Sequence, residues 1–87
     1  MTSILIIEDN TEILENLSEF LEMENYRVLT ANNGSAGIEM ATRFIPQLII
    51  CDVRMPIMDG YEVLHHLLDM VKTKHIPFIF STAMSDT

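Results

Sequence analysis

The sequence predicts one α/β domain built on a doubly wound parallel sheet. Four short runs rich in apolar and β-branched residues alternate with three amphipathic stretches of helical periodicity. Two of the runs, residues 3–7 and 48–51, are apolar on both faces, as strands are when helices cover both sides of a parallel sheet. At 87 residues and 48% hydrophobic composition, the chain can form one core, so we expect a single domain over residues 1–87.

The first strand and the first helix are predicted within residues 3–24. The strand, residues 3–7, stops abruptly at Glu8 and Asp9. Beyond it, apolar residues recur at helical spacing, glutamates fill the other face, and Asn10 is a suitable N-cap. This pattern predicts a helix from Thr11 to about Glu24. Its apolar residues are Ile13, Leu14, Leu17, Phe20 and Leu21.

The second strand is predicted at the edge of the sheet. Residues 26–31 alternate between polar and apolar side chains more than the other runs do, and turn residues at 32–34 end them. A second helix is then expected from residue 35 to residue 44. Gly37 weakens this helix, and it closes before Pro46.

The third strand ends on a carboxylate, as the first one does. Its apolar run, residues 48–51, is followed directly by Asp52 and then by the turn signals Pro56 and Asp59-Gly60. In open parallel α/β sheets, ligands and chemistry lie outside the carboxyl ends of the strands. Asp52 is therefore expected at the functional edge of the sheet.

A third helix and a fourth strand complete the pattern. Asp59 or Gly60 opens the helix, and residues 77–81 form the strand. The apolar stripe expected along the helix comprises Val63, Leu64, Leu67, Leu68 and Val71.

The order of the strands in the sheet follows from handedness and from the position of the carboxylates. Crossovers between parallel strands are right-handed in about 98% of cases. Placing the two strands that end in carboxylates side by side puts the alternating strand outside, which predicts the order 2-1-3-4. The first helix then covers one face, the other two helices cover the opposite face, and one face is less completely covered.

This order predicts an acidic pocket formed by Glu8, Asp9 and Asp52, because neighbouring strands are only about 4.8 Å apart. Two like charges about 5 Å apart repel by about 3 kcal/mol at an effective dielectric constant near 20. The pocket therefore either holds a proton or binds a cation, and hard oxygen ligands favour Mg²⁺. Taken alone, the pair Glu8-Asp9 is more typical of a helix cap or a solvated turn.

A magnesium ion in such a pocket would screen a phosphoryl group from the carboxylates and leave one of them free to attack phosphorus in line. An aspartyl phosphate would result. Asp52 is the best-placed nucleophile because its strand is central, and Glu8 and Asp9 are better placed as metal ligands. The Thr82 hydroxyl, after the fourth strand, would hydrogen-bond the phosphoryl oxygens.

Composition excludes several classes of partner. The balance of 13 acidic against 5 basic residues gives a formal net charge of -8, which disfavours direct binding to nucleic acid or to an anionic membrane. The apolar runs are far shorter than the ~20 residues of a membrane span. A single cysteine, without a charged leader and long apolar segment, predicts a cytoplasmic protein.

Three motifs resemble those of the receiver domains of two-component response regulators, and the resemblance covers residues 3–83. They are Glu8-Asp9 after the first strand, the segment Cys-Asp-Val-Arg-Met-Pro-Ile-Met-Asp-Gly at 51–60, and Ser-Thr-Ala at 81–83. The middle motif is highly specific. The resemblance implies a flavodoxin-like fold and a phosphorelay signalling module, without independent substrate turnover.

The resemblance also implies roles for individual residues. Asp52 would accept a phosphoryl group from a histidine kinase or a phosphotransfer partner, and Thr82 would be the switch hydroxyl. Magnesium would be held by Glu8, Asp9, Asp52 and the backbone carbonyl of Arg54.

The sequence departs from the family after its fourth strand. Receiver domains continue into a fourth helix, a fifth strand and a fifth helix, so we expect an incomplete receiver domain. The family's lysine after strand five has no counterpart, because Lys72 and Lys74 precede strand four. We therefore expect impaired phosphorylation. Residues 77–81 would form an apolar edge, which predicts a homodimer through pairing of that strand or exchange of the C-terminal segment.

Two other functions stay open. The chain could be a truncated, non-signalling interaction or dimerisation fragment that keeps the acidic pocket. A weaker alternative is a nucleotide or flavin binder on the same fold class. Such a binder needs a phosphate-binding loop after the first strand, where residues 8–12 read Glu-Asp-Asn-Thr-Glu and would repel phosphate.

Overall fold

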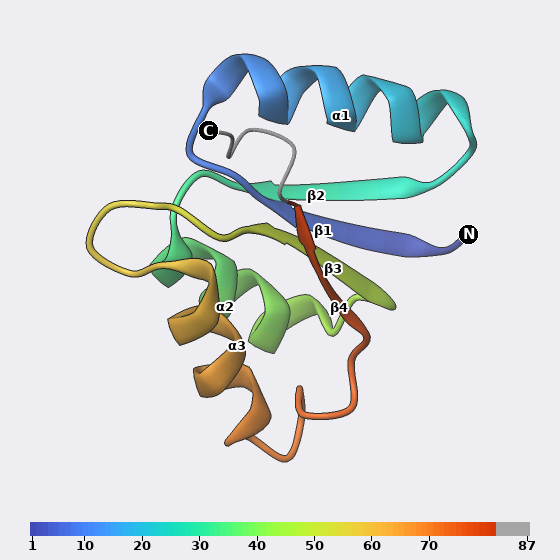
Figure 1. The fold of residues 1–87 in the computed structure, drawn as a ribbon. Helices are drawn as coiled ribbons and strands as arrows, with labels where there is room; N and C mark the ends of the chain where they lie inside the picture. The colour runs from blue at the N-terminus through green and yellow to red at the C-terminus, as the bar shows by residue number, and fades with distance from the viewer. Residues whose placement is uncertain (82–87) are drawn as a thin grey trace.

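A computed structural model describes residues 1–81, which form a parallel sheet with helices on both faces (Figure 1). Every strand and helix predicted from the sequence is present. In order, the elements are β1 (Ser3–Ile7), α1 (Thr11–Met23), β2 (Arg27–Ala31), α2 (Gly34–Phe44), β3 (Leu48–Asp52), α3 (Gly60–Leu68) and β4 (Phe78–Ser81). None of the helices within these residues has the length and apolar content that a bilayer span requires.

The sheet has the predicted order β2-β1-β3-β4, and each pair of neighbouring strands is parallel. This is the doubly wound, flavodoxin-like arrangement expected from the sequence. Ile7 lies opposite Cys51, and Asp52 lies opposite Ser81. The carboxyl ends of β1, β3 and β4 therefore lie at one edge of the sheet, and β1 and β3 run towards the left in Figure 1.

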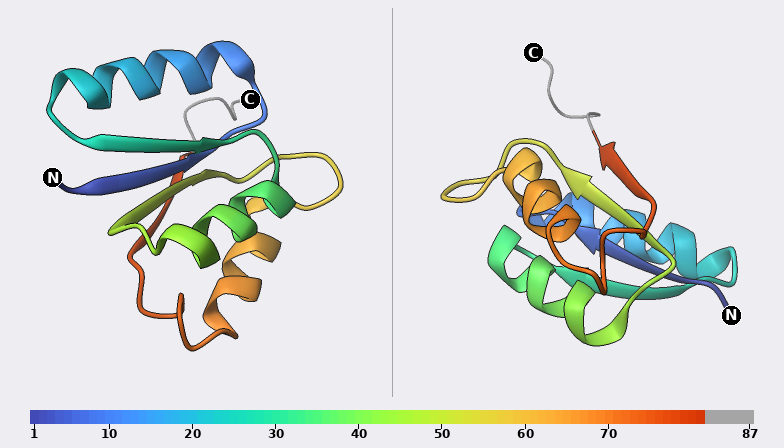
Figure 2. Two further views of the ribbon diagram at one scale, coloured as in Figure 1. Left: turned by 180° about the vertical axis from the view of Figure 1, so that it is seen from behind. Right: turned by 90° about the horizontal axis from the view of Figure 1, so that it is seen from below.

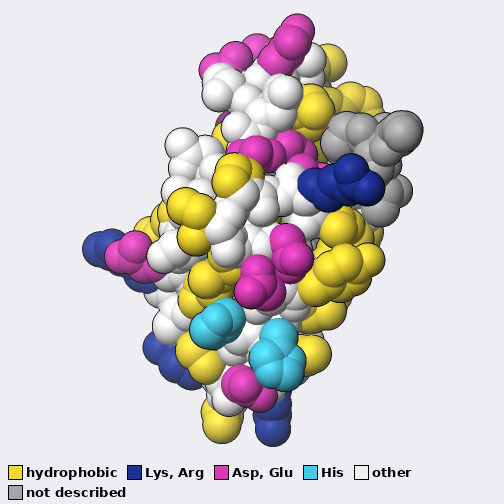
Figure 3. All heavy atoms as spheres, turned by 60° about the vertical axis from the view of Figure 1, so that its left-hand side comes forward, with side chains coloured by type: hydrophobic (Ala, Val, Ile, Leu, Met, Phe, Trp, Pro, Cys, Tyr) yellow, Lys and Arg dark blue, Asp and Glu magenta, His cyan; other side chains and the backbone are white. Residues whose placement is uncertain are grey.

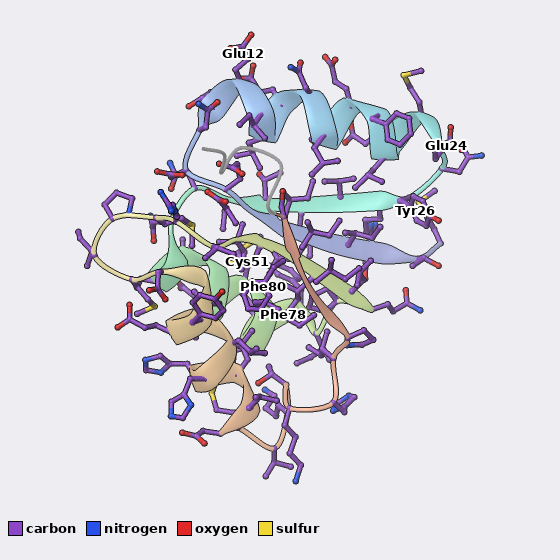
Figure 4. All side chains as sticks on the ribbon, in the orientation of Figure 1. Glu12, Glu24, Tyr26, Cys51, Phe78 and Phe80 are labelled. Atoms are coloured by element: carbon purple, nitrogen blue, oxygen red, sulfur yellow. The ribbon has the colours of Figure 1, made fainter. Side chains whose placement is uncertain are left out.

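Strand alternation divides the core into two layers, one on each face of the sheet. Figure 2 shows α1 on one face and α2 and α3 on the other. On one face, Ile4 and Ile6 of β1 pack with Leu21 of α1. On the other face, the sheet packs against α2 and α3, and Cys51 and Phe78 lie on this side (Figure 4). The buried residues of this larger layer are Leu5, Ile7, Ala31, Ala41, Ile49, Cys51, Met55, Val63, Leu67 and Ile76.

Each helix begins directly after a strand or loop at the carboxyl edge, because a polar side chain caps its first turn. The side chain of Asn10 accepts a hydrogen bond from the Ile13 N–H at 2.9 Å. Asn33 does the same for α2. At α3, Asp59 and Glu62 form a reciprocal capping box, with both hydrogen bonds at 2.9 Å.

The predicted apolar stripes were wrong at three positions. Phe20 is 57% exposed, because Leu21 occupies the position of α1 that faces the sheet. Helix α3 ends at Leu68, so Leu68 and Val71 do not continue its buried stripe and are largely exposed. The buried Thr73 hydroxyl donates to the Leu67 carbonyl at 2.7 Å and holds the chain where it turns away from the helix axis.

Strand β4 forms one edge of the sheet and is less covered than the central strands. Ile79 lies opposite Ile50, on the face of the sheet that carries α1, and is 52% exposed. On the other face, the ring of Phe80 packs 5.0 Å from the ring of Tyr61, measured between centroids. The expectation that one face is less completely covered is thus met at Ile79.

Gly37 marks the closest approach of α2 to the sheet. A Cβ atom at this position would lie 2.5 Å from Cδ1 and 2.8 Å from Cγ1 of Ile7, distances too short for real contacts. The glycine that weakens α2 by helix propensity therefore allows the helix to pack directly on β1.

We expect Gly37→Ala to destabilise the protein, although alanine is the better helix former by about 1 kcal/mol. The added methyl group would force α2 away from Ile7 or drive Ile7 off its rotamer, which costs typically about 1–3 kcal/mol. Urea denaturation should show a lower midpoint. Glu39→Ala, at an exposed position of the same helix, serves as the control and should change stability by less than about 0.5 kcal/mol. A stabilised Gly37→Ala protein would contradict this packing.

Candidate functional site

The acidic pocket is a direct product of strand alternation. In β1, Ile6 faces α1, and Glu8, two residues later, continues the same face. In β3, Ile50 faces α1, and Asp52 follows it in the same way. Because β1 and β3 pair in parallel, the two acidic side chains emerge side by side at the carboxyl edge.

The structure brings Glu8, Asp9 and Asp52 together as predicted. One carboxylate oxygen from each lies within 4.8 Å of the corresponding oxygens of the other two. Glu8 and Asp52 are almost completely buried, with 2% and 4% of their surfaces exposed, whereas Asp9 is exposed. Figure 3, in which this edge of the sheet comes forward, shows acidic side chains near the centre of the face.

Burial and the negative charge of Asp9 both disfavour the ionised forms of the two buried carboxyl groups. Desolvation is the largest cause that raises the pKa of Glu8, and the charges of Asp52 and Asp9 add to it. The pKa of Asp52 is raised by desolvation and then by the charge of Asp9, while the backbone amides of Val53 and Arg54 and a hydrogen bond with the Glu8 side chain oppose the rise. The pocket therefore favours uptake of either protons or a cation.

Two residues that sequence reasoning assigned to a cap and a turn also support the pocket. The backbone N–H of Asn10 donates to Oε2 of Glu8 at 3.1 Å and holds that carboxylate in place. The N–H of Gly60 donates to the Val53 carbonyl at 2.8 Å, and a Cβ at Gly60 would collide with the backbone oxygen of Asp52. The motif Asp59-Gly60 predicts a turn from sequence alone, but it does not reveal that Gly60 lies so close to the backbone of Asp52.

The donor set fits a small divalent cation. Carboxylate oxygens are hard ligands, and oxygens bound to one Mg²⁺ at about 2.1 Å lie roughly 3–4 Å apart. The spacing within 4.8 Å needs only a small closing movement to reach that range. The exposure of Asp9 leaves an open side through which water or a phosphoryl group can reach the ion. Within residues 1–81, no other group of three or more acidic, histidine or cysteine side chains approaches this closely.

Arg54 and Thr82 are the other two predicted site residues. Arg54 lies in the loop after β3, two residues beyond Asp52, and its side chain is exposed. Thr82 lies outside the described residues. The residue before it, Ser81, is opposite Asp52 in the register of β3 and β4.

Cys51 belongs to the core and not to the pocket. Its side chain is fully buried in the layer formed with α2 and α3. Burial, together with the negative charges of Asp52 and Glu8, raises the pKa of its thiol to about 12. The thiol is therefore protonated at neutral pH and is a poor nucleophile.

A family model described as "Response regulator receiver domain" matches residues 4–87. The chain belongs to this family. The receiver fold, the strand order and the acidic pocket at the carboxyl edge thus occur together in one chain.

Individual relatives agree with this assignment. The receiver domain is 40% identical over 81 residues to "Response regulator PleD" of Caulobacter vibrioides, covering 93% of this chain and 18% of PleD. It is 31% identical over 83 residues to "Polar-differentiation response regulator DivK" of Brucella anthropi, covering 95% of this chain and 68% of DivK. The chain therefore spans less than a fifth of the length of PleD.

A solved structure supports the fold independently. The N-terminal domain of a response regulator receiver protein from Methanoculleus marisnigri superimposes with a TM-score of 0.93 at 31% sequence identity. The match covers 100% of this chain and 71% of that structure.

We expect Glu8→Gln to stabilise the metal-free receiver domain at pH 7 by on the order of 1 kcal/mol, because it removes one of two buried, repelling charges. The glutamine oxygen can still accept the Asn10 N–H. A raised carboxyl pKa means that the folded wild type gains stability as pH falls and loses it as pH rises through the folded pKa. The advantage of the variant should therefore shrink towards pH 4.

The measurement is urea denaturation at pH 7 and pH 4 in the presence of a chelator. Glu19→Gln, at an exposed position of α1, is the matched control and should change stability little at either pH. An advantage for Glu8→Gln that is absent at pH 7, or larger at pH 4, would show that Glu8 is not destabilised by its surroundings.

Proposed function

We propose that this receiver domain is a phosphorelay module in which Asp52 accepts a phosphoryl group from a histidine kinase or a phosphotransfer protein. The main support is the approach of three carboxylates to within 4.8 Å at the carboxyl edge of the sheet. Asp52 is the acceptor because it ends the central strand β3, between the ends of β1 and β4.

Magnesium is the proposed cofactor. Glu8, Asp9, Asp52 and the backbone carbonyl of Arg54 would hold it, in agreement with the hard oxygen character of the cluster. When bound, the ion supplies positive charge that neutralises the oxygens of the incoming phosphoryl group. Buried Glu8, fixed by the Asn10 N–H, orients the pocket, while exposed Asp9 leaves it accessible.

The transfer needs no further reactant. An oxygen of the Asp52 carboxylate attacks phosphorus in line, the P–N bond of the donor phosphohistidine breaks, and a P–O bond forms. The imidazole leaves with the electron pair and takes up a proton from water. The backbone amides of Val53 and Arg54, which favour the charged form of Asp52, help to keep it ionised for the attack.

Several finer expectations stay predictions. Thr82 would act as the switch hydroxyl, immediately after the strand whose residue Ser81 lies opposite Asp52. Lys72 and Lys74 precede β4 in the chain, so we expect neither to act as the cationic partner of the phosphoryl group that the family places after its fifth strand. The domain would be phosphorylated on its own acceptor residue and would not turn over a separate substrate. A cytoplasmic location is likewise a prediction.

We expect acetyl phosphate with Mg²⁺ to add one phosphoryl group to the wild type, and Asp52→Asn to abolish the adduct because an amide is a poor nucleophile. Intact mass spectrometry measures the added mass, and hydroxylamine should remove it from an acyl phosphate. Asp69→Asn, which changes an exposed carboxylate after α3, is the matched control and should label like the wild type. A wild-type chain that gives neither this adduct nor a beryllofluoride complex would overturn the proposed function in favour of a non-signalling fragment.

We also propose that the chain forms a homodimer through β4 or through exchange of its C-terminal segment. The supporting observation is that β4 is the outer strand of the sheet formed by residues 1–81, with Ile79 52% exposed and Phe80 only half-buried. Exposed edge strands with apolar side chains pair readily with another chain, and a symmetric pairing covers both copies at once.

Sedimentation equilibrium at micromolar concentration should give twice the chain mass, and Ile79→Lys should shift the protein to monomer because a charge on the edge strand opposes pairing. Val71→Lys, at an exposed apolar position after α3, is the control and should leave the dimer intact. A folded monomer of the wild type would refute the dimer without affecting the role of Asp52.

A further inference from the structure

Ile57 has a backbone conformation that is unfavourable for its side-chain type. Its φ angle is 72°, in the left-handed region that β-branched residues avoid. The N–H of Met58 donates to the Pro56 carbonyl at 2.7 Å, which closes a three-residue turn around Ile57. A three-residue turn with positive φ at its centre is rare and strained.

The fold requires this turn but not an isoleucine in it. The turn sends Met58 inwards, where its side chain packs against the large core layer beside Gly34. Met55, earlier in the loop, is also buried. Glycine or asparagine would adopt the same backbone with less strain. The side chain of Ile57 itself is fully exposed and belongs to neither core layer.

The other two non-glycine residues with positive φ have an evident reason. Asn25 is of a residue type that tolerates this region. Ile45, which caps the C-terminus of α2 at a φ of 46°, packs against the core. Ile57 therefore has a strained backbone, as Ile45 does, but its side chain is not buried. Within residues 1–81, packing gives the Ile57 side chain no stabilising role.

We propose that Ile57 is an apolar anchor for the protein that donates the phosphoryl group. This rests on the proposed function. The loop that carries Ile57 begins directly after Asp52, so a protein that brings a phosphohistidine to Asp52 would meet this loop. Pro56 and Ile57 are exposed on that loop. The strained turn holds the isoleucine outside the core, on the loop that begins at Asp52. An apolar contact there adds affinity without adding charge to a chain of net charge -8.

The occupant is thus a histidine-bearing protein with an apolar surface next to its phosphohistidine. A small phosphodonor has no such surface and gains nothing from Ile57. The proposal therefore predicts that loss of the Ile57 side chain slows transfer from protein donors but not from small donors, although both kinds phosphorylate the same carboxylate.

The experiment compares two donors on the full chain. One is acetyl phosphate with Mg²⁺. The other is a phosphorylated histidine phosphotransfer domain, chosen from a panel because it phosphorylates the wild type. Ile57→Gly should lower kcat/KM with the protein donor about tenfold, mainly through KM, and should leave the rate with acetyl phosphate within twofold. Ile57→Leu, which keeps an apolar side chain, should restore most of the loss, and Val71→Gly, at another exposed apolar position, should change neither rate.

Each other outcome is decisive. If Ile57→Gly slows both donors equally or lowers the melting temperature by more than a few degrees, Ile57 shapes the loop and the docking role is wrong. Equal rates for the variant and the wild type with both donors overturn it as well, as does failure of the whole panel when acetyl phosphate succeeds. A wild type that accepts phosphoryl from neither donor overturns the proposed function first, and the anchor with it.

Discussion

The pairing of β1 with β3 in parallel register is the constraint on which the rest of the structure depends. Both faces of these strands are buried, so a slip of one residue would move each apolar side chain to the wrong layer. The same register sets Glu8 beside Asp52. Apolar packing along the strands thus determines the spacing of the charges at their ends, and the pocket needs no separate element to assemble it.

The pocket works against the stability that this packing supplies. Glu8 and Asp52 are almost fully buried and close together, and burial is the main reason that their pKa values are raised. A small domain has only a modest reserve of stability. The repulsion is therefore tolerable because the carboxylates sit at the edge of a well-packed sheet, and a cation would convert it into attraction. The feature that is least favourable for folding is the one that best fits a functional site.

The sequence predicted the sheet and the pocket because both depend on where apolar runs stop, and such a stop is visible at Asp52. The sequence was a poorer guide to the burial and packing of single residues, which depend on the distances between helices and strands. Phe20 fits the helical period yet lies on the flank of α1, and Gly37 looks like a helix weakener although Ile7 leaves no room for a larger residue. The strain at Ile57 is likewise invisible, because residue type does not reveal a φ angle.

Two further carboxylates close to the pocket in sequence illustrate how local hydrogen bonding limits the site to three acids. Asp59 follows the loop after Asp52, but its side chain accepts the Glu62 N–H, and Glu62 in turn accepts the Asp59 N–H. The capping box occupies both side chains at the start of α3. More negative charge directed at Asp52 would raise its pKa further and disfavour the ionised acceptor. The cap therefore starts the helix and also directs two further carboxylates to backbone N–H groups, which leaves Glu8, Asp9 and Asp52 as the acids available to a cation.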